Sequence, residues 1–295
     1  MRFFVSVAAV KRLPNWLRRN LPERSAISTH QILEKYALNT VCESARCPNQ
    51  SECYSMRTAT FMILGNRCTR RCGFCAVETA KPSEPEADEP ERVAQAAHEL
   101  GLRYVVITSV ARDDLIDEGA HHFAQTLRAV RGLLEDVKIE VLTPDFHARP
   151  ELIKMILSAE PDVFNHNIET VRRLQRRLRP QADYERSLGV LKIVKQIAAE
   201  CVTKSGLMLG LGETDEEIFE TAEDLLMSGC NILTLGQYLS PGLDYLPVEN
   251  FVEPARFEDF RLKLKSMGFC EVYAGPYVRS SYHAGEIFEK AQDAK

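Results

Sequence analysis

Short apolar runs alternate with longer amphipathic segments from residue 61 onward, and this alternation restricts the folds open to the chain. The apolar runs are typical of buried strands, and the amphipathic segments have the residue spacing of helices. We predict strands over residues 61–64, 103–110, 138–143, 163–168, 202–211 and 231–239. We predict helices over residues 92–100, 121–134, 151–159, 184–199 and 215–227. Six such units suggest an α/β fold with a partial parallel barrel, but a doubly wound sheet would show the same alternation.

The chain is apolar enough for a sizeable core, and nothing in it points to a membrane or to nucleic acid. It has 295 residues, 45% of them hydrophobic, which suits one large domain or two small ones. Its net charge of −5, with mixed signs, argues against a dominant nucleic-acid-binding surface. No run is long enough to span a bilayer, and Met1–Val10 lacks the length and cleavage pattern of a signal peptide. We therefore expect a cytoplasmic protein whose thiols stay reduced.

Three cysteines follow the first predicted strand at spacings of four and three residues: Cys68, Cys72 and Cys75. Three thiolates on one tight loop are able to bind three irons of a 4Fe-4S cluster and to leave the fourth iron free for a small molecule. The alternative is zinc, which prefers four closed ligands, whereas this loop offers three cysteines and no nearby histidine. A disulfide is less favoured because the number of cysteines is odd.

A second triplet lies upstream in a polar stretch, at spacings of five and six residues: Cys42, Cys47 and Cys53. Its spacing fits no common zinc pattern, but a zinc knuckle or a chance grouping stays an alternative for this triplet taken alone. Beside the first triplet, we interpret it as a second metal-binding loop. The other three of the nine cysteines lie in or beside apolar segments and are interpreted as core residues: Cys201, Cys230 and Cys270.

The two triplets together resemble the paired cysteine loops of the lipoyl synthase family, within the radical S-adenosylmethionine (SAM) superfamily. Further blocks are similar to that family: Pro14–Arg18, Thr108–Val110, Arg112–Leu115, Asn165–Thr170, Lys204–Thr214 and Arg279–His283. The resemblance covers roughly residues 13–285. It implies a TIM-like radical SAM barrel, (β/α)6, over residues 58–250. It also implies an N-terminal extension over 1–57 that carries the upstream cysteines, and a C-terminal closing segment over 251–295.

The resemblance also implies a chemistry. A 4Fe-4S cluster at Cys68, Cys72 and Cys75 would bind SAM, and the radical formed from SAM would take hydrogen from C6 and C8 of an octanoyl group on a lysine of a carrier domain. A second 4Fe-4S cluster at the upstream triplet would supply two sulfur atoms and be consumed, with two SAM used per lipoyl group. Ser281, in preference to Ser280, would be the fourth ligand of this auxiliary cluster. Such a protein is a sulfur-inserting transferase of lipoate biosynthesis.

Partners follow from the same resemblance. They are octanoylated carrier domains such as the glycine cleavage H protein and the E2 subunits of 2-oxoacid dehydrogenases, an electron donor such as ferredoxin or flavodoxin, and iron–sulfur carrier proteins.

Two other classes of function stay open. One is another radical SAM sulfur-inserting enzyme, but biotin synthase lacks the upstream triplet and a tRNA methylthiotransferase usually has an added RNA-binding domain. The other is a non-enzymatic scaffold, which two clusters with an open corner argue against.

SAM needs hydrogen-bonding partners, which we expect at the carboxyl ends of the strands. Four residues stand there with suitable side chains, although capping and turn chemistry would also account for them: Ser109, Asn165, Asn167 and Glu169. Gly210 and Gly212 would let the backbone approach the adenine, or would form a strand-to-helix turn with Thr214 as the cap. Exclusion of water from the radical would draw on aromatic residues that are otherwise expected in the core: Tyr36, Phe61 or Tyr238.

Arginines are concentrated in two places. Arg70 and Arg71 lie between the cysteines of the downstream triplet, where we expect exposed side chains, with tuning of the cluster potential or steering of anions as the other roles. Five arginines fall within the eight residues from Arg172 to Arg179. They would contact an acidic partner, hold a carboxylate or solvate a helix face, and we predict solvation for most of them.

Overall fold

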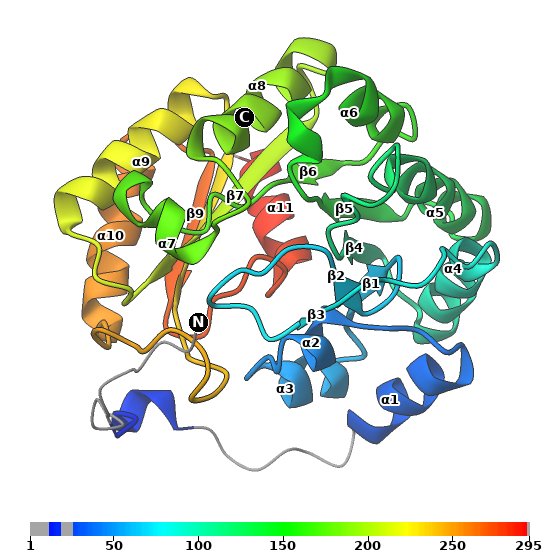
Figure 1. Ribbon diagram of the computed structural model, residues 1–295, viewed down its shortest axis with the longest axis horizontal. Coiled ribbons are helices and arrows are strands. Elements are labelled where there is room, and N and C mark those ends of the chain that lie inside the picture. The colour runs from blue at the N-terminus through cyan, green and yellow to red at the C-terminus, as the bar shows by residue number, and fades with distance from the viewer. Residues whose placement is uncertain (1–11, 19–25, 294–295) are drawn as a thin grey trace.

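A seven-stranded parallel sheet forms the centre of the protein (Figure 1). The computed structural model describes residues 12–18 and 26–293, so the predicted absence of a signal peptide at Met1–Val10 lies outside the described residues. The strands follow one another in chain order: β1 (Thr60–Ile63), β4 (Tyr104–Ser109), β5 (Lys138–Leu142), β6 (Val163–Asn165), β7 (Val202–Leu209), β8 (Ile232–Gln237) and β9 (Glu271–Gly275). A doubly wound sheet reverses its strand order, so this sequential order confirms the partial barrel.

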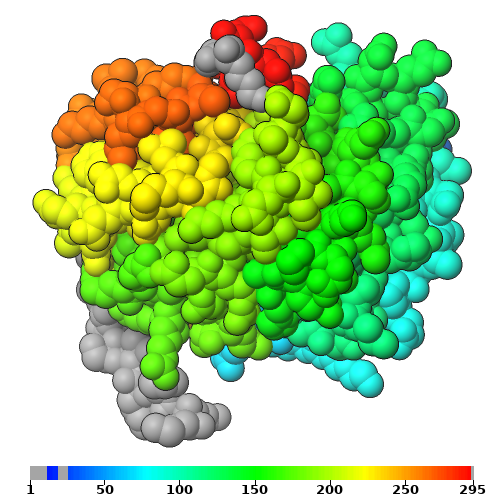
Figure 2. Space-filling view, turned by 90° about the horizontal axis from the view of Figure 1, so that it is seen from above, coloured from blue at the N-terminus to red at the C-terminus, as the bar shows by residue number. Residues whose placement is uncertain are grey.

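Helices cover the outside of the sheet, as the amphipathic segments predict. They are α4 (Glu89–Leu100), α5 (Ala120–Leu133), α6 (Pro150–Leu157), α8 (Tyr184–Ile197), α9 (Asp215–Met227) and α10 (Pro254–Ser266). Figure 2 shows this outer surface, on which the colours change in chain order from cyan through green to yellow and orange. The N-terminus of α9 confirms Thr214 as a cap, because its side chain accepts a hydrogen bond from Glu217 N while Glu217 reaches back to the Thr214 amide.

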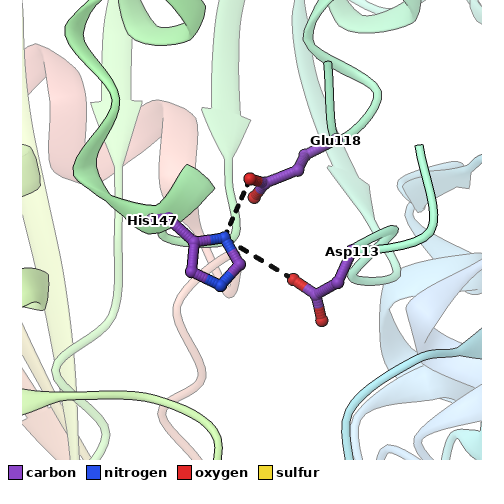
Figure 3. A group of neighbouring side chains, drawn as sticks. All are labelled: Asp113, Glu118 and His147. Atoms are coloured by element: carbon purple, nitrogen blue, oxygen red, sulfur yellow. Dashed lines mark hydrogen bonds and ion pairs between the residues drawn. The ribbon is translucent and has the colours of Figure 1, made fainter. Parts of the chain in front are cut away.

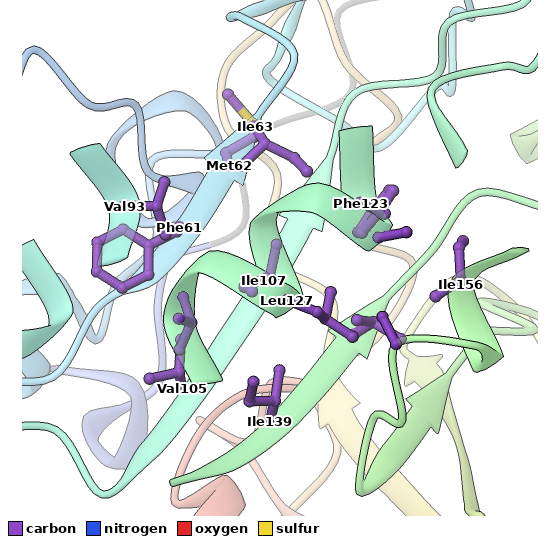
Figure 4. Close-up of a cluster of buried hydrophobic side chains, with 14 of the residues drawn as sticks. Phe61, Met62, Ile63, Val93, Val105, Ile107, Phe123, Leu127, Ile139 and Ile156 are labelled. Atoms are coloured by element: carbon purple, nitrogen blue, oxygen red, sulfur yellow. The ribbon is translucent and has the colours of Figure 1, made fainter. Parts of the chain in front are cut away.

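The outer core lies between the sheet and this ring of helices. Figure 4 shows the apolar side chains of β1, β4 and β5 that meet those of α4, α5 and α6 there: Phe61, Ile63, Val105, Ile107, Ile139, Val93, Phe123, Leu127 and Ile156. All of them are buried. Their burial explains why these strands read as nearly continuous apolar runs, as expected for a parallel sheet covered by helices.

The inside of the barrel is polar at mid-height and apolar at its lower end. Lys204 on β7 pairs with Glu140 on β5 at 3.0 Å, and both side chains are fully buried. Asn165 Nδ2 and the Tyr104 hydroxyl also donate to the Glu140 carboxylate, each at 2.8 Å. Below this group, α11 (Ala284–Asp293) packs on the first residues of β6, β7 and β8. This helix closes the end of the barrel at which the strands begin, which leaves their carboxyl ends as the open end.

The structure differs from the sequence prediction in the number of strands. A seventh strand, β9, pairs in parallel with β8, where a six-stranded barrel with a separate C-terminal segment was expected. It is short and half-exposed, so it lacks the apolar run that marks the inner strands. β6 is shorter than predicted because the chain leaves the strand after Asn165, and Glu169 reaches a positive φ of 67°.

Three short helices precede the barrel: α1 (Ala26–Lys35), α2 (Val41–Ser44) and α3 (Gln50–Ser55). α2 packs on β1, and α1 packs on α3 and α4. Thr40 forms an antiparallel bridge with Phe61, which fixes the start of α2 on the first strand. The remaining short elements are η1 (Asn15–Leu17), β2 (Arg67–Cys68), β3 (Glu78–Thr79), η2 (Phe146–Ala148), η3 (Arg172–Leu174) and α7 (Gln175–Leu178). Over the described ranges, no helix has both the length and the apolar character needed to cross a membrane.

Candidate iron–sulfur and SAM site

The downstream triplet lies on a closed loop at the open end of the barrel (Figure 1). β2 and β3 pair in parallel at the base of this loop, so its two ends are held together. Two further backbone bonds anchor it: Thr69 N donates to Ala111 O after β4 at 3.1 Å, and Gly73 N donates to Leu178 O in α7 at 2.7 Å. We call residues 68–75 the cluster loop.

The cysteines of the cluster loop are half-buried. Burial raises the pKa of Cys72 to about 11 and that of Cys75 to about 12. The Cys68 Sγ accepts hydrogen bonds from two backbone amides, Arg70 N at 3.4 Å and Ala111 N at 3.3 Å. Such thiols lose their protons when a metal binds, and amide donors of this kind stabilise the resulting thiolate.

The upstream triplet faces the same space as the cluster loop. A cavity of about 350 Å³ at the open end is lined by all three upstream cysteines and by Cys75: Cys42, Cys47, Cys53 and Cys75. Burial raises the pKa of Cys42 to about 12, and the Thr60 amide, hydrogen-bonded to this thiol, acts in the opposite direction. None of the nine cysteines forms a disulfide. The cavity therefore joins the upstream triplet to the cluster loop, which reaches it through Cys75.

Neither cysteine triplet has its three sulfur atoms gathered around a single point, as one zinc ion would require. Four ligands around zinc at about 2.3 Å place neighbouring sulfurs about 3.8 Å apart. In the described part of the chain, only Asp113, Glu118 and His147 have ligand atoms that all lie within 4.8 Å of one another. Both cysteine triplets are more widely spread. A 4Fe-4S cube needs this wider spread, because each thiolate binds a different iron.

The C-terminal block contributes both of its serines to the cavity wall. Ser281 Oγ accepts a hydrogen bond from Thr60 Oγ1 at 2.8 Å, and the Thr60 amide in turn bonds the Cys42 thiol. Ser280 instead bonds the side chain of Asn167, with Oγ to Oδ1 at 2.9 Å. The two adjacent serines thus face different partners: Ser281 lies beside the upstream triplet, and Ser280 beside a predicted SAM-binding residue.

The predicted SAM-binding residues fall into three groups. Asn167 and Glu169 line the cavity, and burial raises the pKa of the Glu169 carboxyl. Ser109 and Asn165 lie at the ends of their strands but do not line it; Ser109 Oγ and Asn165 Oδ1 are buried with no hydrogen-bond partner in the described structure. Gly210 and Gly212 lie outside the cavity wall in a turn with positive φ. The Glu213 carboxylate occupies the amides of Gly210 and Leu211, so a contact between these glycines and adenine stays a prediction.

Of the three aromatic candidates for water exclusion, one lines the cavity. Tyr238 is buried in the cavity wall, and its hydroxyl donates to Leu246 O at 2.7 Å. Phe61 belongs to the outer core, and Tyr36 bonds Glu99 on the outside of the protein.

The expectation of exposed arginines on the cluster loop is wrong for Arg70 and right for Arg71. Arg70 is buried and binds two carboxylates at the strand ends, with NH2 to Asp113 Oδ1 at 2.6 Å and to Asp145 Oδ1 at 2.8 Å. Asp145 is fully buried and also faces Arg186 at 3.4 Å. Arg70 therefore holds the cluster loop onto the ends of β4 and β5.

Asp113, which binds Arg70, also belongs to a polar group with Glu118 and His147 (Figure 3). His147 Nδ1 lies 2.8 Å from Glu118 and 3.9 Å from Asp113. The two carboxylates are already balanced, since Asp113 binds Arg70 and Glu118 lies 3.2 Å from Arg149. The group is thus an ion-pair network that supports Arg70 and not a cation site. Sequence reasoning missed it, although Asp113 and Asp145 both follow predicted strands.

Comparison with known proteins agrees with this geometry. Residues 62–225 match the radical SAM superfamily. The chain is 52% identical over 279 residues to lipoyl synthase 2 of Gloeobacter violaceus, covering 94% of this chain and 96% of that protein. It is 51% identical over 286 residues to lipoyl synthase of Rhodopirellula baltica, covering 96% and 90%.

Solved structures of low sequence identity share the fold. Methylornithine synthase aligns with a TM-score of 0.54 at 15% identity, covering 81% of this chain and 67% of that one. Streptococcus suis SuiB bound to the precursor peptide SuiA aligns with a TM-score of 0.57 at 12% identity, covering 95% and 60%. These structures establish the barrel, and the relatives of about half-identical sequence establish the family.

Proposed function

Because the chain belongs to the lipoyl synthase family of the radical SAM superfamily, we propose that it inserts two sulfur atoms, at C6 and C8, into an octanoyl group bound to a lysine of a carrier domain. The observation that carries this proposal is the single cavity that both cysteine groups reach. The sulfur donor and the source of the radical both have to reach C6 and C8 of the octanoyl chain, so they have to face the same cavity.

Cys68, Cys72 and Cys75 would hold the cluster that binds SAM. With SAM bound, such a cluster supplies the electron that cleaves SAM to methionine and a 5′-deoxyadenosyl radical. The chain's own part is to hold and orient these groups. The amides of Arg70 and Ala111 stabilise the Cys68 thiolate, while Asn167 and Glu169 offer hydrogen-bonding groups to SAM from the cavity wall.

Cys42, Cys47 and Cys53 would hold the auxiliary cluster, with Ser281 as its fourth ligand. Ser281 is favoured over Ser280 because its Oγ lies beside Thr60, next to the Cys42 thiol, whereas Ser280 is engaged with Asn167. A serine oxygen is a harder ligand than a thiolate and matches iron in such a cluster less well, so this bond would open most readily when sulfide is withdrawn.

The rest of the cavity wall suits an alkyl chain. Apolar side chains make up much of it, among them Val41, Phe74, Leu142, Met208 and Leu239. We assign them to the octanoyl chain, with Tyr238 limiting the access of water to the radical. The carrier would be an octanoylated H protein or E2 domain, the electron would come from a ferredoxin or flavodoxin, and iron–sulfur carrier proteins would restore the consumed cluster.

Matched cysteine variants test this division of roles. The Cys47→Ala variant should still release 5′-deoxyadenosine from SAM and dithionite but add no sulfur to an octanoyl-lysyl peptide. The Cys72→Ala variant should do neither, and Cys230→Ala, in the core, should retain both activities after reconstitution. Sulfur insertion by the Cys47→Ala variant at the wild-type level would remove the auxiliary cluster as the donor.

The two serines provide a second matched pair. Ser281→Ala should abolish or strongly reduce sulfur insertion while SAM cleavage continues. Ser280→Ala should affect SAM binding more than sulfur insertion, because Ser280 is bonded to Asn167. Equal rates of insertion in wild type and Ser281→Ala would show that Ser281 is not the ligand.

A further inference from the structure

Arg179 is a buried guanidinium with no carboxylate partner. It is 8% exposed, whereas the other four arginines of the run are exposed, as predicted for most of them. Its NH1 contacts only uncharged oxygens, Asn167 O at 3.3 Å, Ile168 O at 3.2 Å and Ser187 Oγ at 3.4 Å. Among residues 12–18 and 26–293, no carboxylate oxygen lies within 4.0 Å of its guanidinium.

The other two buried arginines of the described chain differ in this respect. Arg70 pairs with Asp113 and Asp145, and Arg112 pairs with Asp114 at 2.9 Å. A buried charge without a counter-ion costs several kcal/mol, so proteins normally pair it. Arg179 therefore lacks the contact ion pair that Arg70 and Arg112 have, although its charge also acts on the Glu169 carboxyl from a greater distance.

The position of Arg179 indicates which anion would pair with it. The preceding residue, Leu178, accepts the hydrogen bond from Gly73 that anchors the cluster loop, at 2.7 Å. Arg179 then turns inward under the loop to the end of β6. From there its charge acts on two groups of this site, the Cys72 thiol of the cluster loop and the Glu169 carboxyl.

We infer that Arg179 is the counter-ion of the cluster bound by Cys68, Cys72 and Cys75, and that its charge stabilises the reduced state of that cluster. Three thiolates around a 4Fe-4S core give a net negative charge, which increases when the cluster takes up one electron from the reductant. Nearby charge is one of the factors that set the potential of such clusters. This role depends on the proposed function, since it requires a cluster on the cluster loop.

The test is a redox titration followed by electron paramagnetic resonance, with dithionite as reductant and no SAM. All proteins carry alanine at the three upstream cysteines, so that only one cluster contributes to the signal. Arg179→Gln keeps a hydrogen-bond donor but removes the charge, and Arg179→Lys keeps the charge. Arg177→Gln is the control, because Arg177 belongs to the same run but is exposed.

Arg179→Gln should shift the midpoint potential to a more negative value, while Arg179→Lys and Arg177→Gln should stay near the value of the parent protein, which keeps both arginines and has alanine at the three upstream cysteines. An unchanged midpoint in a fully loaded Arg179→Gln protein would overturn the inference. If that midpoint is unchanged and SAM binds more weakly, the arginine serves the carboxylate of SAM and not the cluster.

If Arg179→Gln fails to retain its iron, the midpoint potential of Arg179→Lys decides between the two roles. An iron-loaded Arg179→Lys protein with the midpoint of the parent protein supports a role of the positive charge. A shifted midpoint or loss of iron in the lysine variant as well would overturn it in favour of a role in backbone geometry. Wild-type protein that binds no iron would instead refute the proposed function, so the two failures are distinguishable.

Discussion

Asp145→Asn should destabilise the protein by about 1.5–3 kcal/mol at neutral pH, because the Asp145 carboxylate compensates the charge of the buried Arg70. Asp145 is fully buried and contacts Arg70 at 2.8 Å and Arg186 at 3.4 Å. Breaking a buried ion pair costs about 3–5 kcal/mol when a charge is left alone. Here Asp113 still binds Arg70, at 2.6 Å, so we expect a smaller loss, similar to that of a charged hydrogen bond, about 1.5–3 kcal/mol.

The effect should depend on pH in a defined direction. Burial disfavours the charged form of Asp145, but Arg70 outweighs burial and holds the pKa of this carboxyl well below its usual range. A carboxyl with a lowered pKa stabilises the fold above its unfolded pKa, about 3.9, and this contribution is lost as the pH falls toward the folded value. The deficit of Asp145→Asn should therefore shrink below about pH 4, by up to about 1.4 kcal/mol per pH unit.

Urea unfolding of the metal-free protein measures both quantities, at about pH 7 and about pH 3.5. Asp113→Asn is the matched control, since its side chain is 27% exposed and its loss should cost less. Equal stability of Asp145→Asn and wild type at neutral pH would refute the role of Arg70 as a clamp on the cluster loop. A deficit of the same size at both pH values would refute its electrostatic origin.

Two further predictions concern the barrel itself. Gly210→Ala should cost about 1–3 kcal/mol or more, because φ is +98° and an added Cβ would lie 2.2 Å from Gln237 Nε2; Gly212→Ala, with its nearest neighbour at 3.6 Å, should cost less in the same urea assay. Lys204→Met should cost about 3–5 kcal/mol by leaving the Glu140 carboxylate unpaired, and Lys204→Met with Glu140→Gln should recover much of that loss. Additive effects of the two substitutions would contradict the pairing.

The inner strands could be predicted from sequence because burial on both faces makes them nearly continuous apolar runs. β9 could not, since four of the five residues of this edge strand are half-exposed and it has no such run. The existence of both cysteine loops was likewise readable from spacing. Their meeting at one cavity was not, because it depends on how α2 packs on β1 and α3 on α1.

The arginines show the limit of a reading based on residue type. Arg70 and Arg71 are adjacent residues of the same type, yet Arg70 is buried against two carboxylates and Arg71 is exposed. Arg177 and Arg179 differ in the same way, because α7 ends at Leu178 and the chain then turns Arg179 inward. In both cases the direction of the backbone in three dimensions decides burial, and the local sequence does not encode it.

One anaerobic measurement tests the central claim most directly. The protein is reconstituted with iron and sulfide, the iron per chain is counted, and SAM, dithionite and an octanoyl-lysyl peptide are added. Mass spectrometry follows the peptide. The proposed function predicts about eight irons per chain, as two four-iron clusters require, and a peptide that gains two sulfur atoms. Zinc in place of iron, or 5′-deoxyadenosine without any sulfur added to the peptide, would contradict it.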